Sequence, residues 1–131
     1  MRENNSSLQE LNSSRQQIKF IKYWIPLFFY AILIFYISSI PGKDIPALFK
    51  FQDVVFHIME YAVFAFMLSR AFKAYFPQLN FPRRLYWVFL ISIVYAASDE
   101  WHQSFVPGRC AAITDVISDG IGVLVANFIY R

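Results

Sequence analysis

Charged residues are scarce in this sequence. They make up 16% of its 131 residues, whereas hydrophobic residues make up 57% and aromatic residues 20%. Soluble domains carry about 25% charged and about 45–50% apolar residues. The shortage of charge therefore argues against a soluble domain and favours a protein that contacts lipid. The net charge of +3 is small, and we expect no nucleic-acid partner.

Cysteine is almost absent. Cys110 is the only one, so the chain cannot form an internal disulfide, and a thiolate metal site cannot be assembled from one chain. A nucleophilic cysteine would need a nearby base and an exposed thiolate. His102 and Arg109 lie close in the sequence, so this role remains a minor alternative to a small side chain in a turn.

Glycine is also rare, and two of the four glycines, Gly120 and Gly122, lie close together in one apolar stretch near the C-terminus. Small residues in membrane helices let neighbouring helices approach closely. We expect this packing role for both glycines rather than a role in ligand access.

Four apolar stretches account for most of the chain, at about residues 23–40, 53–72, 85–103 and 113–130. A helix needs about 20 apolar residues to cross a bilayer core, although about 17 can suffice. The third stretch is apolar only over Leu85–Ser98, and it becomes long enough if its helix continues to Gln103. The pattern predicts an all-α membrane protein, a compact bundle of four transmembrane helices.

The first 17 residues differ from the rest, because they are polar and rich in Asn, Ser and Gln. This composition is typical of disordered segments. We therefore predict a disordered tail over residues 1–17 and one membrane domain over residues 18–131. Pro26 is expected in the first turn of the first span, where its missing N–H costs least.

Lys and Arg are distributed unequally between the two ends of such a bundle. Four spans place both termini and the connection between the second and third spans on one side. That side holds nine of the twelve basic residues, and the other side holds Lys43, Lys50 and Arg109. Because cytoplasmic loops are enriched in Lys and Arg, we predict a multi-pass protein of the cell membrane with both termini in the cytoplasm.

Ionisable residues inside the predicted spans gather near the outward end. Such residues cost about 2.5–3.5 kcal/mol each on insertion scales, so they usually face the bundle interior and pair with one another. A spacing of four residues places side chains on one face of a helix, as for Asp53, His57 and Tyr61. We expect the faces to converge on one site. Its expected members are Asp53, His57, Glu60, Tyr61, Asp99, Glu100, Gln103, Arg109, Asp115 and Asp119.

Three interpretations of this cluster remain open. It could be a structural network that fixes the register of the helices. It could be a catalytic site, with His and carboxylates as acid/base groups or metal ligands. It could also bind or conduct a ligand without chemistry. Six carboxylates against one arginine make the cluster acidic, so either a divalent cation is bound there or some carboxylates are protonated.

Three motifs in this order resemble the VanZ-like family of bacterial membrane proteins. They span a little over half of the chain, and the second is the most specific. The motifs are Asp53-x3-His57-x3-Tyr61, then Ser98-Asp99-Glu100-x2-Gln103-Ser104-Phe105-Val106-Pro107-Gly108-Arg109, then Asp115-x3-Asp119-x2-Gly122. This chain departs from the family pattern at Val54, where relatives often carry Lys, and at Asp119, where Asn is frequent. The resemblance implies an integral protein of the cell envelope, and the founding member is associated with low-level resistance to the glycopeptide teicoplanin.

We therefore predict a protein that acts on a lipid-linked or envelope substrate at the outer leaflet, with the lipid bilayer as its surroundings. The predicted catalytic or cation-holding residues are His57, Glu60, Asp99, Glu100 and Asp115. The predicted substrate-binding residues are Arg109, Gln103, Asp53, Tyr61 and Asp119. In this hypothesis Arg109 holds an anionic group such as phosphate or carboxylate. The alternatives are a non-catalytic ligand-binding or accessory protein and a small oligomeric transporter.

Overall fold

The computed structural model describes the backbone of residues 2–131 and the side chains of residue 9 and residues 11–131. The described residues form four α-helices and one short 3-10 helix, with no strand among them. These elements are α1 (Arg2–Ser38), η1 (Gly42–Asp44), α2 (Gln52–Tyr75), α3 (Phe81–Gln103) and α4 (Ile113–Ile129). The predicted all-α architecture is confirmed.

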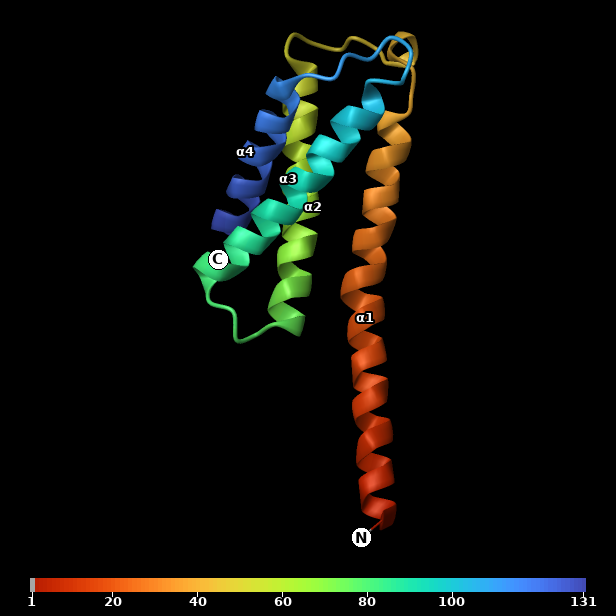
Figure 1. Ribbon diagram of the computed structural model, residues 1–131, viewed down its shortest axis with the longest axis vertical. Coiled ribbons are helices and arrows are strands. Elements are labelled where there is room, and N and C mark those ends of the chain that lie inside the picture. The colour runs from red at the N-terminus through yellow and green to blue at the C-terminus, as the bar shows by residue number, and fades with distance from the viewer. Residues whose placement is uncertain (1) are drawn as a thin grey trace.

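The four helices alternate in direction, as Figure 1 shows. Residues 39–51 and 104–112 connect the helices at one end of the bundle, which we call the upper end. The connection from α2 to α3 and the C-terminus lie at the opposite, lower end. α2 packs most extensively against α4, and α1 packs against α2 and, more sparsely, against α3.

Helix α1 is far longer than its neighbours. Its 37 residues correspond to about 55 Å, and its N-terminal part projects beyond the bundle (Figure 1). The sequence predicts disorder over residues 1–17, whereas α1 continues through residues 2–17, and Met1 lies outside the described residues. Extending an existing helix costs less than starting one, and residues such as Leu11, Arg15 and Gln16 are good helix formers. Pro26 therefore lies inside the helix and not in its first turn.

Local side-chain contacts set the beginnings of α2 and α3. The Asn80 side chain accepts a hydrogen bond from the Arg83 backbone N–H at 3.2 Å, and Pro82 occupies the first turn of α3, as helix N-termini favour. Gln52 ties the preceding connection to α2: its Oε1 accepts from the Leu48 N–H at 2.6 Å, and its Nε2 donates to the Pro46 carbonyl at 3.0 Å. The two Gln52 contacts hold the upper connection close to the start of α2.

Two glycines permit close approaches that position the upper end. A Cβ at Gly122 would lie 2.2 Å from the Ile58 carbonyl oxygen, so α2 and α4 contact each other through their backbones. A Cβ at Gly42 would lie 1.9 Å from the Gly108 carbonyl oxygen, so the two upper connections also contact each other through their backbones. Gly120 differs, since a Cβ there would meet the end of the Ile93 side chain at 3.3 Å. The predicted packing role is thus confirmed at Gly122.

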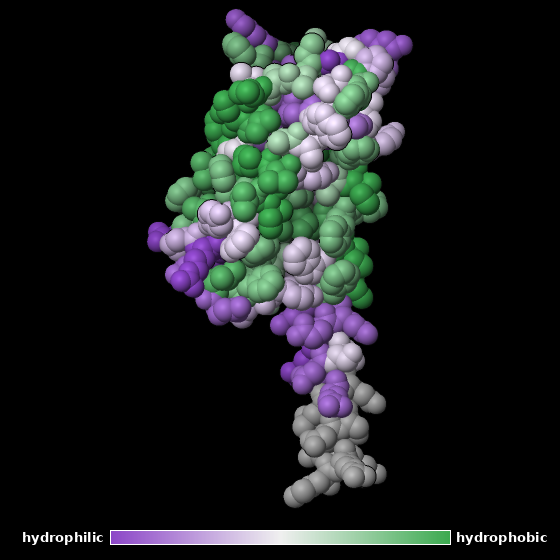
Figure 2. Space-filling view, in the orientation of Figure 1, coloured by the Kyte–Doolittle hydropathy of each residue, from purple (hydrophilic) through white to green (hydrophobic). Residues whose placement is uncertain are grey.

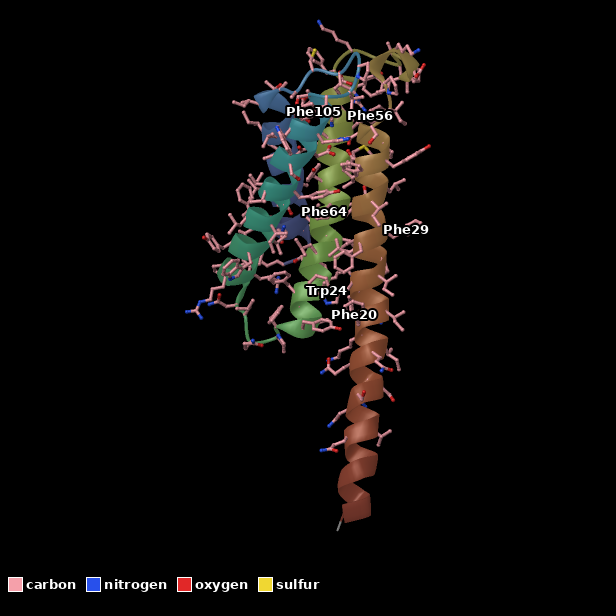
Figure 3. The ribbon with its side chains drawn as sticks, turned by 45° about the vertical axis from the view of Figure 1, so that its right-hand side comes forward. Phe20, Trp24, Phe29, Phe56, Phe64 and Phe105 are labelled. Carbon is pink, nitrogen blue, oxygen red and sulfur yellow. The ribbon has the colours of Figure 1, made fainter. Side chains whose placement is uncertain are left out.

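Polar side chains are buried beside an apolar core, and large apolar side chains are exposed. Asp119 and Asn127 are among the largest fully buried side chains, whereas Ile113, Ile129 and Phe29 are 81%, 82% and 73% exposed. Figure 2 shows apolar side chains over the body of the bundle and hydrophilic ones toward its ends. In Figure 3, Phe29 lies on the outer side of α1 and Trp24 lies between α1 and α2. Extensive exposed apolar surface marks contact with a partner or a membrane.

Two helices within the described residues are long and apolar enough to cross a membrane: Leu11–Ser38 of α1, and α2. Four such spans are predicted from the sequence. Helix α4 has only 17 residues and is slightly too short. Helix α3 includes the charged pairs Arg83-Arg84 and Asp99-Glu100, which make it less apolar than Leu11–Ser38 and α2.

Candidate functional site

All four helices deliver polar side chains to the upper end of the bundle. Ser38 comes from the end of α1 and His57 from the second turn of α2. Asp99 and Glu100 come from the last turns of α3, and Asp119 comes from α4. All five residues are buried. The site is therefore assembled from segments that are distant in the sequence.

His57 lies at the centre of this cluster. Its Nδ1 is 2.9 Å from Asp119 Oδ1, and its Nε2 is 4.0 Å from Glu100 Oε1. The close approach of α2 and α4 at Gly122 brings His57 and Asp119 together, because each lies within one helical turn of that contact. With Asp119 accepting a hydrogen bond from Nδ1, the second ring nitrogen is directed toward Glu100.

Glu100 is held at one oxygen and left free at the other. Its Oε2 accepts a hydrogen bond from the Ala112 backbone N–H at 3.0 Å, whereas the buried Oε1 has no hydrogen-bond partner. Asp115, in the first turn of α4, completes the group. One possible ligand atom from each of His57, Glu100 and Asp115 lies within 4.8 Å of the other two. This trio can hold a metal ion.

Asp99 belongs to a separate network that links α1 to α3. Its Oδ1 accepts from Ser38 Oγ at 2.6 Å, and its Oδ2 accepts from Gln103 Nε2 at 3.0 Å. Ser38 Oγ also lies 3.4 Å from His102 Nδ1. Ser38 is absent from the set of site residues predicted from the sequence. The signal that could have found it is the pair Ser38-Ser39 at the end of an otherwise apolar span.

Arg109 contacts backbone and not carboxylates. Its Nε donates to the Ile40 carbonyl at 3.2 Å, and its Nη2 donates to the Ile37 carbonyl at 3.1 Å. Within the part of the chain whose side chains are described, no Lys or Arg forms an ion pair with a carboxylate. A counter-ion role for Arg109 is thus not found in the structure. The last carbonyls of a helix have no intrahelical donor, and the guanidinium donates to one of them, Ile37, and to Ile40 just beyond the end of α1.

Two neighbouring cavities open at this end, with volumes of about 240 and 300 Å³. Both are lined by Asp53, His57, Gln103 and Arg109. Glu60 lines the first cavity and Asp115 the second. These six residues are the predicted site members that a ligand in the cavities would reach.

The other predicted members lie deeper. Asp99, Glu100 and Asp119 do not line either cavity, and they act through the contacts described above. Tyr61 is only 1% exposed, and its hydroxyl has no hydrogen-bond partner. Its ring packs 6.3 Å from that of Tyr95, so Tyr61 belongs to the core beneath the site.

The fold and the site define an all-helical protein with apolar helices of membrane-spanning length and a buried acidic cluster at one end. The family described as VanZ/LLP1 matches residues 4–131, and the chain belongs to this family. The predicted resemblance to the VanZ-like family is thereby confirmed. No curated protein and no solved structure matches the chain. Family membership and the two apolar helices together indicate membrane association.

Proposed function

We propose that the protein is a four-span protein of the bacterial cell envelope that binds and acts on an anionic lipid-linked molecule at the outer leaflet. The observation that carries the proposal is the Asp119–His57 pair beside two cavities that also contain the cationic Arg109. Membership of the VanZ/LLP1 family supports a further proposal, that the protein contributes to low-level glycopeptide resistance.

Exposed apolar side chains on α3 and α4 support four spans. Leu90 and Val94 on α3, and Ile117 and Ile121 on α4, are all exposed. Such residues favour lipid around these helices too, while their polar residues face the interior. The lower end carries most of the Lys and Arg residues, and the positive-inside rule then places that end, with both termini, in the cytoplasm.

The upper cavities suit an anionic headgroup. Among the side chains that the structure describes, Arg109 is the only Lys or Arg that lines them. Its planar guanidinium matches phosphate and carboxylate. Asp119 holds His57 through Nδ1, which leaves Nε2 free to take a proton or to bind a cation beside a ligand.

A third cavity supports the lipid part of the proposal. It has a volume of about 450 Å³ and lies between α1, α2 and α3. Its lining is apolar or aromatic and includes Trp24, Phe28, Phe64, Phe72 and Tyr95. A hydrocarbon chain is the chemical group that such a lining favours, because burying apolar surface is its main source of binding energy.

Lipid binding by the purified protein tests the proposal. Wild type in detergent is titrated with a polyprenyl monophosphate and with the corresponding polyprenyl alcohol, and binding is followed by native mass spectrometry. We expect the phosphate to bind more tightly than the alcohol. Arg109→Gln should abolish this preference, whereas Arg83→Gln, a matched change at the exposed lower end, should keep it.

Asp53→Asn is a variant that we expect to strengthen phosphate binding, the opposite of Arg109→Gln. Asp53 lines both cavities, and its side chain makes no hydrogen bond within the described part of the chain. Removing its negative charge should strengthen binding of the phosphate without disturbing the fold. Equal binding of phosphate and alcohol by wild type, or no change in Asp53→Asn, would show that these cavities do not bind an anionic headgroup.

A further inference from the structure

We propose that His57, Glu100 and Asp115 bind a divalent transition-metal ion through His57 Nε2 and one oxygen from each carboxylate. The three residues come from α2, α3 and α4, and their possible ligand atoms all lie within 4.8 Å of one another. The site goes beyond the lipid ligand proposed above, because its argument rests on the three side chains and not on the two upper cavities.

The free oxygen of Glu100 is the observation that points to an ion. Glu100 is 5% exposed, and its Oε1 has no hydrogen-bond partner. Buried polar groups are almost always paired, and leaving a carboxylate oxygen unpaired is costly. The Ala112 N–H fixes the other oxygen, so Oε1 faces His57 Nε2 at 4.0 Å. A cation between them would satisfy both atoms.

His57 is already oriented as a metal ligand. A metal-bound histidine commonly donates its other ring N–H to a carboxylate, which fixes the tautomer and the ring orientation. Asp119 takes this position, with its Oδ1 2.9 Å from His57 Nδ1. In the tautomer with the proton on Nδ1, Nε2 carries the lone pair that would bind the ion, and it faces Glu100.

The local charge also favours a cation. Glu100, Asp115 and Asp119 lie around one histidine, and no described Lys or Arg forms an ion pair with any of them. Arg109, which lines the neighbouring cavities, donates to the backbone of Ile37 and Ile40. An ion would supply the missing positive charge.

The ligand set indicates which ions fit. One imidazole nitrogen with two carboxylates suits Zn²⁺ or Mn²⁺ better than Ca²⁺ or Mg²⁺, which prefer oxygen ligands alone. Tetrahedral ligands at 2.0–2.2 Å from zinc lie about 3.4 Å apart, so the three groups need to close by about 1 Å. Three protein ligands leave a position for water or substrate. His57 and Asp115 both line the cavity of about 300 Å³.

Metal binding by the lipid-free protein tests the assignment. Wild type purified in detergent is stripped with a chelator and reloaded with Zn²⁺ or Mn²⁺, and bound metal is measured by mass spectrometry and by thermal shift. We expect a single ion per chain and a higher melting temperature with metal. Asp119→Asn should weaken metal binding about 10–100-fold, because Asp119 orients the ligand His57 without binding the ion. Glu100→Gln or Asp115→Asn removes a ligand and should weaken metal binding by more than about 100-fold.

Asp44→Asn is the matched control, because Asp44 is an acidic residue of the upper end that lies outside the trio. It should bind metal as wild type does. Circular dichroism shows whether each metal-free variant is folded. A folded wild type that binds no ion, or equal binding by Glu100→Gln and wild type, would overturn the proposal. Loss of the ion only in Asp44→Asn would do so as well. Since no lipid is present, these results are independent of the headgroup experiment.

Discussion

At the scale of single residues, Arg109 depends on partners that local sequence does not reveal. The sequence predicts that Arg109 holds an anionic group of a ligand, and a lysine at position 109 is then expected to leave stability nearly unchanged. In the structure its guanidinium instead donates to the carbonyls of Ile37 and Ile40. One acceptor lies in the last turn of α1 and the other just beyond it, and a single ammonium group cannot reproduce the planar geometry that contacts both.

We therefore expect Arg109→Lys to lower stability. A hydrogen bond from a charged donor contributes roughly 1–2 kcal/mol at a half-buried position, so losing one of the two should cost about that amount. Thermal unfolding in detergent measures the change. Arg83→Lys at the lower end is the control, since Arg83 is exposed. Identical melting of both variants would show that the two backbone contacts of Arg109 add nothing to stability.

The sequence identified the acidic cluster but not its internal contacts. The spacing of four residues places Asp53, His57 and Tyr61 on one face of α2, yet only the first two line the cavities. Which carboxylate meets which nitrogen of His57 depends on how deeply α4 packs against α2. That depth is a property of tertiary packing and cannot be read from either helix alone.

At the scale of helices, the strongest prediction from the sequence concerned α3. Its apolar run ends at Ser98, and bilayer length required the helix to continue to Gln103, as it does. The end of the helix is therefore confirmed, whereas its crossing of a bilayer stays a prediction. The projecting part of α1 was missed because its composition is polar, and a polar composition alone does not distinguish a disordered tail from a helix that continues an apolar one.

The two glycines of α4 provide a matched test of the contact between α2 and α4. Gly122→Ala places a methyl group 2.2 Å from the Ile58 carbonyl oxygen, which forces the helices apart, and we expect a loss of about 1–3 kcal/mol. Gly120→Ala meets only the flexible end of Ile93 at 3.3 Å. It should be neutral or stabilising by up to about 1 kcal/mol through helix propensity. Chemical denaturation of both variants in detergent measures the difference, and equal stabilities would contradict the backbone contact.

At the scale of the whole molecule, polarity and topology lead to the same orientation. Alternating helices bring the basic α2–α3 connection and both chain ends to the lower side of the bundle, away from the acidic site. In membrane proteins, Lys and Arg are enriched in cytoplasmic loops, whereas acidic residues have little influence on the orientation. In the proposed orientation, the two upper cavities face the outer leaflet.

Cysteine labelling in intact cells tests this orientation directly. In a Cys110→Ser background, Ser104→Cys introduces a thiol at an exposed position of the upper end, and Gln78→Cys introduces one at an exposed position of the lower connection. A membrane-impermeant maleimide should label Ser104→Cys in intact cells, because the upper end faces outward. It should label Gln78→Cys only after permeabilisation. The reverse pattern would place the acidic site in the cytoplasm, and labelling of both in intact cells would show that the lower connection is not cytoplasmic. Either result would exclude the proposed orientation, because α2 and α3 must cross the bilayer to separate these two positions.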